Sequence, residues 1–190
     1  LIYQKPKLLK KNLKDNSTKV YKINIDKNDY QIFSFRNGIV YTDSNDTTAY
    51  ISKNNFLSNA SMQYFKIDKI NSFNGSISKN ETLFNGTPKF RKKFSGTVLS
   101  LLSGGAAKDN FTHWFTDIIP RIKIFSIKFK LKQINKYYVP SIKYKYQIDS
   151  LKFLGIKKSQ LISSEKYKHI QANHIYATSH PCYHLPMKVK

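Results

Sequence analysis

Three side chains that can move protons or bind anions stand four residues apart along one stretch of the chain: His113, Asp117 and Arg121. Residues four apart on a helix share one face, so these groups would form a single polar stripe. Asp117 has a histidine neighbour and a half-apolar helix around it, a setting in which proteins perturb carboxyl pKa values. Chemistry alone leaves two interpretations open: a carboxylate that takes part in catalysis, or a structural carboxylate paired with His113 or Arg121.

The helix that must position this stripe is predicted between Phe111 and Phe129. At 100° per residue, a broad apolar arc lies beside the stripe and consists of Phe111, Trp114, Phe115, Ile118, Ile122, Phe125 and Phe129. Asp109 or Asn110 is expected to cap the first turn. Pro120 removes one backbone hydrogen bond and is expected to kink the helix just after Asp117. One side of the helix would then pack while the other presents chemistry.

A longer motif surrounds the stripe and continues downstream of it. The pattern Asn-aromatic-x-His-Trp-x-x-Asp-x-x-Pro-Arg resembles the signature of glycosyltransferase family 61, carried here by Asn110, Phe111, His113, Trp114, Asp117, Pro120 and Arg121. In that family a strand ending in Val-Pro follows, then a helix closing on Leu-Gly-Ile and two short strands. The matching residues here are Tyr137 to Pro140, Gln147, Leu151, Leu154 to Ile156, Gln160 to Ile162 and His174 to Tyr176. The resemblance covers Gly104 to Pro186.

The resemblance implies an enzyme that moves a sugar from a nucleotide-sugar donor to a hydroxyl of a glycan or another acceptor, with inversion at the anomeric carbon. Such a transfer needs a base on the acceptor hydroxyl and positive groups near the leaving diphosphate. Asp117 is the candidate base or its orienting partner, and His113 is the alternative base. Arg121, Asn110 and Trp114 are candidate substrate-binding residues. No metal or other cofactor is expected beside the donor.

The fold that the resemblance implies is α/β: a β-rich N-terminal region, then a Rossmann-like parallel half corresponding to the acceptor side of a two-domain GT-B enzyme. We expect a basic leader or linker over 1–18, the β-rich region over 19–95 and the Rossmann-like region over 96–186. A donor-binding domain is expected after residue 190, so the fragment alone is expected to be inactive. The leader could also form a short amphipathic helix at a membrane surface.

Hydrophobic patterning indicates the individual elements. Alternation over 19–52 predicts an antiparallel meander, with turns at Asn37-Gly38 and at 43–46. Strands are predicted at 98–102, 136–140, 160–163 and 170–178, and a helix at 144–154 closed by Gly155. Short strand–helix–strand connections are typical of a parallel α/β layer. Ligands of such layers lie at the carboxyl ends of the strands.

The charge of the chain is strongly positive. Lysine and arginine number 33 against 11 acidic residues, a formal net charge of +22, yet only Arg36, Arg91 and Arg121 are arginine. Nucleic-acid interfaces depend on arginine for bidentate contacts, so specific nucleic-acid binding is not expected. The lysine excess fits the Asn, Ile, Tyr and Phe richness of an AT-biased genome. A non-catalytic basic module that binds nucleic acid or an anionic glycan is the alternative function.

The remaining sequence features bear on compartment and metal. Cys182 is the single cysteine, which excludes an intrachain disulfide framework. His174, His180, Cys182 and His184 lie close together, but their spacing matches no standard zinc pattern, so a metal is not expected. No stretch reaches the apolar length of a membrane span, although an anchor upstream of Leu1 stays open. A bacterial protein of this kind would work in the cytoplasm or in peripheral contact with a membrane, and a eukaryotic one in the ER or Golgi lumen.

Overall fold

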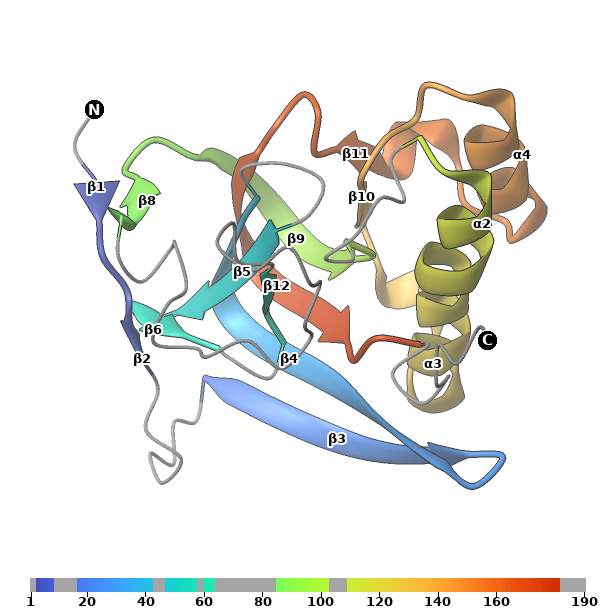
Figure 1. Ribbon diagram of the computed structural model, residues 1–190, viewed down its shortest axis with the longest axis horizontal. Helices are drawn as coiled ribbons and strands as arrows, with labels where there is room; N and C mark the ends of the chain where they lie inside the picture. Colours follow the sequence, from blue (N-terminus) through green and yellow to red (C-terminus); the bar gives the residue numbers. More distant parts are fainter. Residues whose placement is uncertain are drawn as a thin grey trace, which may run out of the picture.

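The computed structural model describes residues 3–8, 17–42, 47–57, 60–63, 85–102 and 109–181. These residues form a mixed α/β structure that is mostly strand. Its centre is a ten-stranded sheet in which the strands along the main path follow the order β11-β10-β9-β12-β4-β5-β6-β2 (Figure 1). Strand β3 pairs with β4 and strand β7 with β5, and a separate two-stranded sheet joins β1 and β8.

The strands of the first half are β1 (Tyr3–Gln4), β2 (Lys7–Leu8), β3 (Thr18–Ile25), β4 (Asn28–Tyr41), β5 (Thr47–Ser52), β6 (Asn55–Phe56), β7 (Met62–Gln63) and β8 (Thr87–Pro88). Those of the second half are β9 (Lys92–Ser100), β10 (Lys136–Val139), β11 (Leu161–Ser163) and β12 (His169–Thr178). The helical elements are α2 (Phe111–His113), η2 (Trp114–Ile118), α3 (Ile119–Lys128), η3 (Leu131–Gln133), α4 (Lys145–Phe153) and η4 (Lys158–Gln160).

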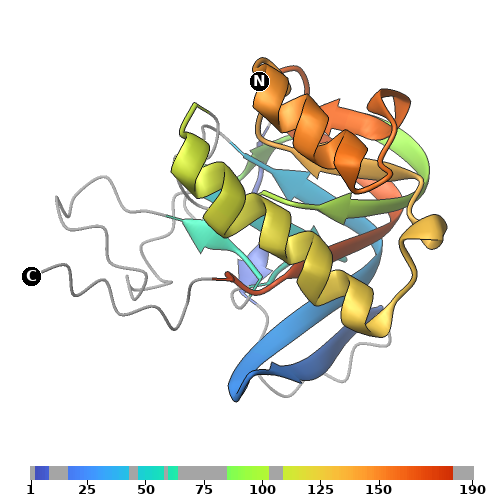
Figure 2. The same ribbon diagram turned by 90° about the vertical axis from the view of Figure 1, so that its right-hand side faces the viewer.

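The second half contains the predicted parallel layer. Strands β9, β10 and β11 lie side by side and parallel, with the central helix between the first two and α4 between the last two. The chain then returns to the other side of β9, where β12 is also parallel. The strand order therefore reverses between β9 and β12. Both helices lie on one face of the sheet (Figure 2), whereas a doubly wound fold has helices on both faces.

The first half forms an antiparallel meander, as the alternation predicts. Strands β3 and β4 join through Asp26 and Lys27, both at positive φ, so the hairpin turn lies here. The predicted turn at Asn37-Gly38 is wrong, because both residues lie inside the continuous strand β4. Gly38 is needed there for packing: a Cβ would come within 2.5 Å of the Phe35 ring. The other predicted turn, at 43–46, lies outside the described residues.

Alternating side chains of the sheet enter two apolar cores. On the helix side Leu99, Tyr137 and Tyr176 pack with residues of the central helix and α4, among them Trp114, Ile118, Ile122, Phe125 and Leu151. Their chain neighbours pack into the second core, which includes Val98, Tyr138, Ala177, Phe35 and Tyr50. Strands β9, β10 and β12 are thus apolar on both faces, as parallel strands usually are.

The central helix differs from a regular α-helix. Asn110 caps it, accepting a hydrogen bond from the amide of His113. The next five residues form the π-helical turn η2, in which the Ile119 amide donates to the Trp114 carbonyl. This turn lies just before Pro120, so the irregularity expected from the proline takes the form of a π turn. A π turn holds extra residues, so the later positions are rotated from the places that 100° per residue assigns.

The predicted faces of the central helix are right in part: Trp114, Ile118, Ile122 and Phe125 of the apolar arc are buried. Phe111 and Phe115, assigned to the apolar arc, are 60% and 39% exposed. Asp117 and Arg121, assigned to the presenting side, are 5% and 2% exposed. The polar stripe therefore begins at the surface and continues into the interior of the protein.

The strands and the sheet continue across the predicted region boundaries. Within the leader, residues 3–8 form β1 and β2, which pair with β8 and β6 rather than forming a helix. The boundary at residue 95 falls inside β9. Strands from both predicted regions share the ten-stranded sheet. Among the described residues, no helix combines the length and the apolar character that crossing a membrane requires.

Candidate functional site

Polar side chains gather where β9 and β12 end. Ser100 is the last residue of β9 and Thr178 the last residue of β12. The central helix passes these ends and brings Asp117 and Arg121 to them. Because the strand order reverses between these two parallel strands, this is the position at which open α/β sheets bind ligands. The structure thus places Asp117 and Arg121 at the carboxyl ends of β9 and β12.

Asp117 and His113 form a hydrogen-bonded pair. His113 Nδ1 lies 2.7 Å from Asp117 Oδ2, and Thr116 Oγ1 donates to Asp117 Oδ1 at 2.9 Å. The His113 side chain is 42% exposed, whereas that of Asp117 is only 7% exposed. When the Nδ1–H donates to the carboxylate, a neutral imidazole carries its free lone pair on Nε2. The arrangement holds one tautomer of a surface histidine by means of a buried carboxylate.

A second histidine, His180, lies on the other side of the same carboxylate. Its Nε2 is 3.8 Å from Asp117 Oδ2, and the residue is 8% exposed. Burial, followed by the positive charge of Arg121, lowers the pKa of His180 to about 4, although Asp117 opposes this shift. His180 is therefore neutral at neutral pH. The imidazole that is hydrogen-bonded to the Asp117 carboxylate is that of His113.

Arg121 ties the helix to the end of β12. Its Nε donates to the Asp117 carbonyl oxygen at 2.9 Å, and one terminal nitrogen donates to the Thr178 carbonyl oxygen at 2.7 Å. Those bonds satisfy one main-chain acceptor in η2 and one at the last residue of β12. Arg121 thus fixes the position of Asp117 and contributes a buried positive charge beside it.

Two further predicted substrate-binding residues have structural roles. Trp114 is fully buried, and its indole N–H donates to Ser150 Oγ at 2.9 Å, which joins the central helix to α4. Asn110 is the helix cap. Some residues of the motif therefore hold the helix in place, as Asn110 and Trp114 do, whereas His113 is exposed to solvent.

An aromatic surface joins the central helix to α4. Phe111, Phe115, Tyr144 and Tyr146 form it, with Phe111 and Phe115 ring centroids 4.8 Å apart and the two tyrosine rings stacked at 5.6 Å. Phe111 also contacts the edge of Tyr146 at 5.1 Å. Exposed aromatic clusters on soluble proteins mark interaction sites. This aromatic surface lies on the first turns of the two helices.

Two members of the site were not predicted from sequence as part of it. The sequence places His180 only in a histidine-rich segment without a standard zinc pattern, and Tyr50 lies in the alternating stretch 19–52 that predicts strands. Tyr50 donates to Ser100 Oγ at 2.7 Å, and burial raises its pKa, while the charge of Arg121 acts to lower it. A buried tyrosine hydroxyl needs a partner, but only the strand order reveals which one.

The zinc interpretation is tested only in part. Cys182 and His184 lie outside the described residues, and His174 is engaged elsewhere, with Ser34 Oγ 2.7 Å from its Nε2. In the described ranges, His, Cys, Asp and Glu side chains form no group of three or more that could hold a metal ion.

Comparisons with family models, with curated proteins and with solved structures find no match to this chain.

Proposed function

We propose that the chain contributes the acceptor side of an inverting glycosyltransferase, with His113 as the base and Asp117 as the residue that orients it. The observation that carries the proposal is the 2.7 Å hydrogen bond between the exposed His113 and the buried Asp117. A histidine whose tautomer is fixed by a carboxylate is a recurrent general base. Of the two roles that the sequence leaves open for Asp117, the geometry favours the orienting one.

The proposed reaction is a single displacement. His113 Nε2 takes the proton from the acceptor hydroxyl as that oxygen forms a bond to the anomeric carbon of the donor sugar. The bond between the anomeric carbon and the diphosphate oxygen breaks, and its electron pair leaves with the nucleoside diphosphate. Attack from the face opposite the leaving group inverts the anomeric configuration. The Asp117 carboxylate stabilises the imidazolium that forms.

The aromatic surface supports an acceptor that is itself a carbohydrate. Phe111, which is 60% exposed, offers apolar ring surface on the first turn of the helix that carries the proposed base, and Tyr144 carries a hydroxyl. The C–H faces of a sugar ring are apolar and its hydroxyl groups are polar, so such a surface matches both. Lys143 lies 5.1 Å from the Tyr144 ring centroid and adds a positive charge at the edge of the surface.

The fold supports the proposal only at the level of its overall architecture. The parallel strands β9 to β12, the two intervening helices and the reversal of strand order are features of a Rossmann-like half. The GT-B arrangement and the donor-binding domain come from the resemblance to family 61 and belong to the proposal.

A transfer assay on the full-length protein tests the proposed function. The protein is incubated with uridine, guanosine and cytidine diphosphate sugars and with a set of glycan acceptors, and release of the nucleoside diphosphate is measured. We expect acceptor-dependent release that His113→Ala lowers by about 10²- to 10⁴-fold. Lys143→Ala, a change at the rim of the aromatic surface, serves as the matched control and should alter KM rather than kcat. Release that His113→Ala leaves unchanged would remove the proposed base.

A further inference from the structure

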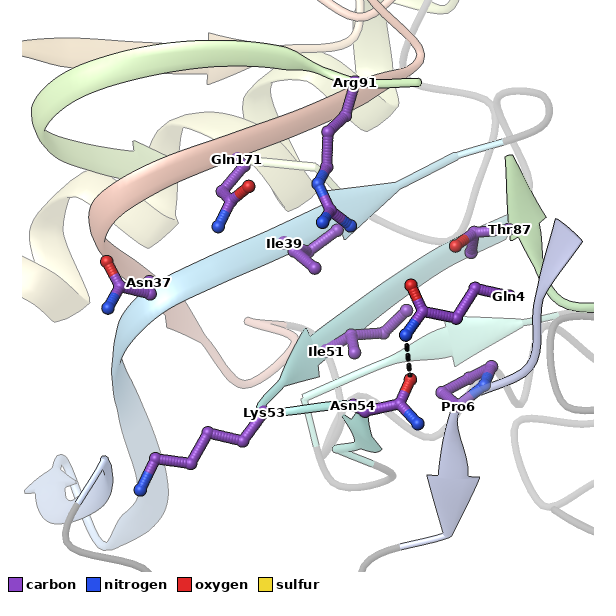
Figure 3. A pocket seen from close by; sticks show the side chains of 10 residues that line it. All are labelled: Gln4, Pro6, Asn37, Ile39, Ile51, Lys53, Asn54, Thr87, Arg91 and Gln171. Carbon is purple, nitrogen blue, oxygen red and sulfur yellow. Dashed lines mark hydrogen bonds between the residues drawn. The ribbon is translucent and has the colours of Figure 1, made fainter. Parts of the chain in front are cut away.

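A second site lies on a different part of the sheet. A pocket of about 230 Å³ is lined by Gln4, Pro6, Asn37, Ile39, Ile51, Lys53, Asn54, Thr87, Arg91 and Gln171. Figure 3 shows that its floor is formed by β4, β5 and β12 and one wall by the segment around Gln4 and Pro6. Its volume is below the roughly 300–1,000 Å³ of sites for drug-sized ligands, so the pocket suits a small molecule.

The lining of the pocket combines apolar side chains, those of Pro6, Ile39 and Ile51, with polar and positively charged ones. No Asp or Glu is among the ten lining residues. The Arg91 guanidinium extends over Ile39 into the pocket (Figure 3). The side-chain amides of Gln171, in β12, and of Asn37, in β4, also line it. Opposite them, Gln4 Nε2 donates to Asn54 Oδ1 at 3.1 Å. The Lys53 side chain points away from the other lining residues. Arg91 is therefore the cation that a ligand in the pocket would meet.

Among the described residues, no carboxylate forms an ion pair with Arg91. His169 lies beside it at the start of β12, with its Nδ1 3.0 Å from the Phe90 carbonyl oxygen, to which it donates. The residue is 8% exposed, and its Nε2 has no hydrogen-bond partner. Burial lowers the pKa of His169 to about 4, and Arg91 contributes to the lowering, so the imidazole is neutral at neutral pH. A half-buried guanidinium next to a neutral ring gains free energy when an anion pairs with it.

The pocket is far from His113 and Asp117. Arg91 immediately precedes β9, whereas Ser100, beside the candidate active site, ends it. Nine strand residues at about 3.3 Å each separate the two ends. The pocket thus lies toward the amino end of the parallel strands and the candidate active site at their carboxyl end.

We propose that this pocket binds a small ligand that carries one carboxylate or phosphate group together with several hydroxyl groups, such as an acidic or phosphorylated monosaccharide. Arg91 pairs with the anionic group through its planar donors, which match a carboxylate or a phosphate in two hydrogen bonds. The amides of Gln171, Asn37 and Asn54 provide both donors and acceptors, which suits hydroxyl groups. The site is independent of the proposed transfer reaction.

Calorimetric and NMR titrations of the full-length protein at physiological salt test the proposal. The probes are glucuronate, glucose 6-phosphate, inorganic phosphate and uncharged glucose. We expect saturable binding of glucuronate or glucose 6-phosphate, weaker binding of phosphate alone and the weakest binding for glucose. Comparison of the two sugar acids identifies which anionic group the site prefers.

Variants of Arg91 connect the binding to the pocket. Arg91→Ala should weaken binding by at least about 10-fold, since it removes a charge-assisted pair, and Arg91→Lys should restore only part of it because an ammonium lacks the planar fork. Lys89→Ala removes one exposed positive charge two residues away and should leave affinity within about twofold. Equal losses in Arg91→Ala and Lys89→Ala would reduce the effect to general charge and overturn the proposal, as would the absence of saturable binding by every probe.

Discussion

At the residue scale, one carboxylate contacts two histidines with different properties. His113 is hydrogen-bonded to Asp117 and exposed, whereas His180 is 3.8 Å away, buried and neutral at neutral pH. The first contact follows from spacing along a helix and was predicted from sequence. The second joins residues 63 positions apart through the end of β12, and no local pattern predicts it. In this site, the sequence predicts the partner of a histidine only where that partner lies within one helical turn.

The buried histidines make the protein less stable in mild acid. Burial lowers the pKa of His169 and of His180 to about 4, below the ordinary value of 6.5. Between those values the unfolded chain binds more protons than the folded chain, so the free energy of unfolding falls as the pH falls from 6.5 toward 4. Each group contributes at most about 1.4 kcal/mol per pH unit. Urea unfolding at pH 7.0 and 5.5 measures the difference.

The variant His169→Asn isolates one of these contributions. Asparagine can still donate to the Phe90 carbonyl oxygen in place of Nδ1, but it does not titrate. Its loss of stability between pH 7.0 and 5.5 should be smaller than that of the unchanged protein. An identical loss in both proteins would mean that His169 does not titrate with a lowered pKa.

At the element scale, the central helix shows what periodicity can and cannot predict. Its position, its cap at Asn110 and an irregularity near Pro120 follow from residue types. The form of that irregularity does not, because a π turn is selected by how the helix packs on the sheet. The predicted apolar arc is right at Ile118, Ile122 and Phe125, which are buried, and wrong at Phe115, which is exposed, while Asp117 is buried and not presented to solvent. The buried end of the polar stripe became evident only in the folded chain.

Two glycines test how tightly β9 is packed against its surroundings. Gly96 lies in β9 at φ +83, and a Cβ there would meet the Asn135 side chain, whereas Gly155 closes α4 at φ +78 with no atom within 4 Å. Gly155→Ala should cost only backbone strain, about 1 kcal/mol. Gly96→Ala should cost more, about 2–4 kcal/mol, because it adds a clash and displaces the Asn135 amide that accepts from the Thr97 N–H.

Chemical denaturation of the two glycine variants compares these costs directly. Because both residues are at positive φ, the Gly155 variant is a control for strain alone. Equal destabilisation in the two variants would show that the contact of β9 with Asn135 contributes nothing to stability.

At the scale of the whole molecule, local patterns predicted most strands and both long helices, but not their order in the sheet. The path β11-β10-β9-β12-β4 depends on contacts between residues far apart in sequence, such as the pairing of β12 with β4. The reversal beside β9, which places the candidate site, was therefore not predictable from any one segment. The pocket at Arg91 depends on the same order, since its lining comes from β4, β5 and β12 and from β1 and β8 of the two-stranded sheet.

The net charge of +22 leads to a prediction about nucleic acid. Of the three arginines, Arg121 is buried against Thr178, and the exposed aromatic surface contains no arginine. Binding to DNA or RNA should therefore be weak, independent of sequence and lost steeply as salt is raised. Fluorescence anisotropy with labelled oligonucleotides from 50 to about 300 mM salt checks this. Tight binding with a base preference at the highest salt would favour a nucleic-acid function over the transferase.

The most direct test of the central claim is a double-mutant cycle on the transfer rate of the full-length protein, with the donor and acceptor that the screen identifies. The variants are Asp117→Asn, His113→Ala and their combination, each with its melting temperature measured so that rates refer to folded molecules. If Asp117 orients His113 as the base, each single change lowers kcat by about 10²- to 10⁴-fold, and the double variant is little worse than either. Near-normal turnover in both single variants, or losses that multiply in the double variant, would contradict the account.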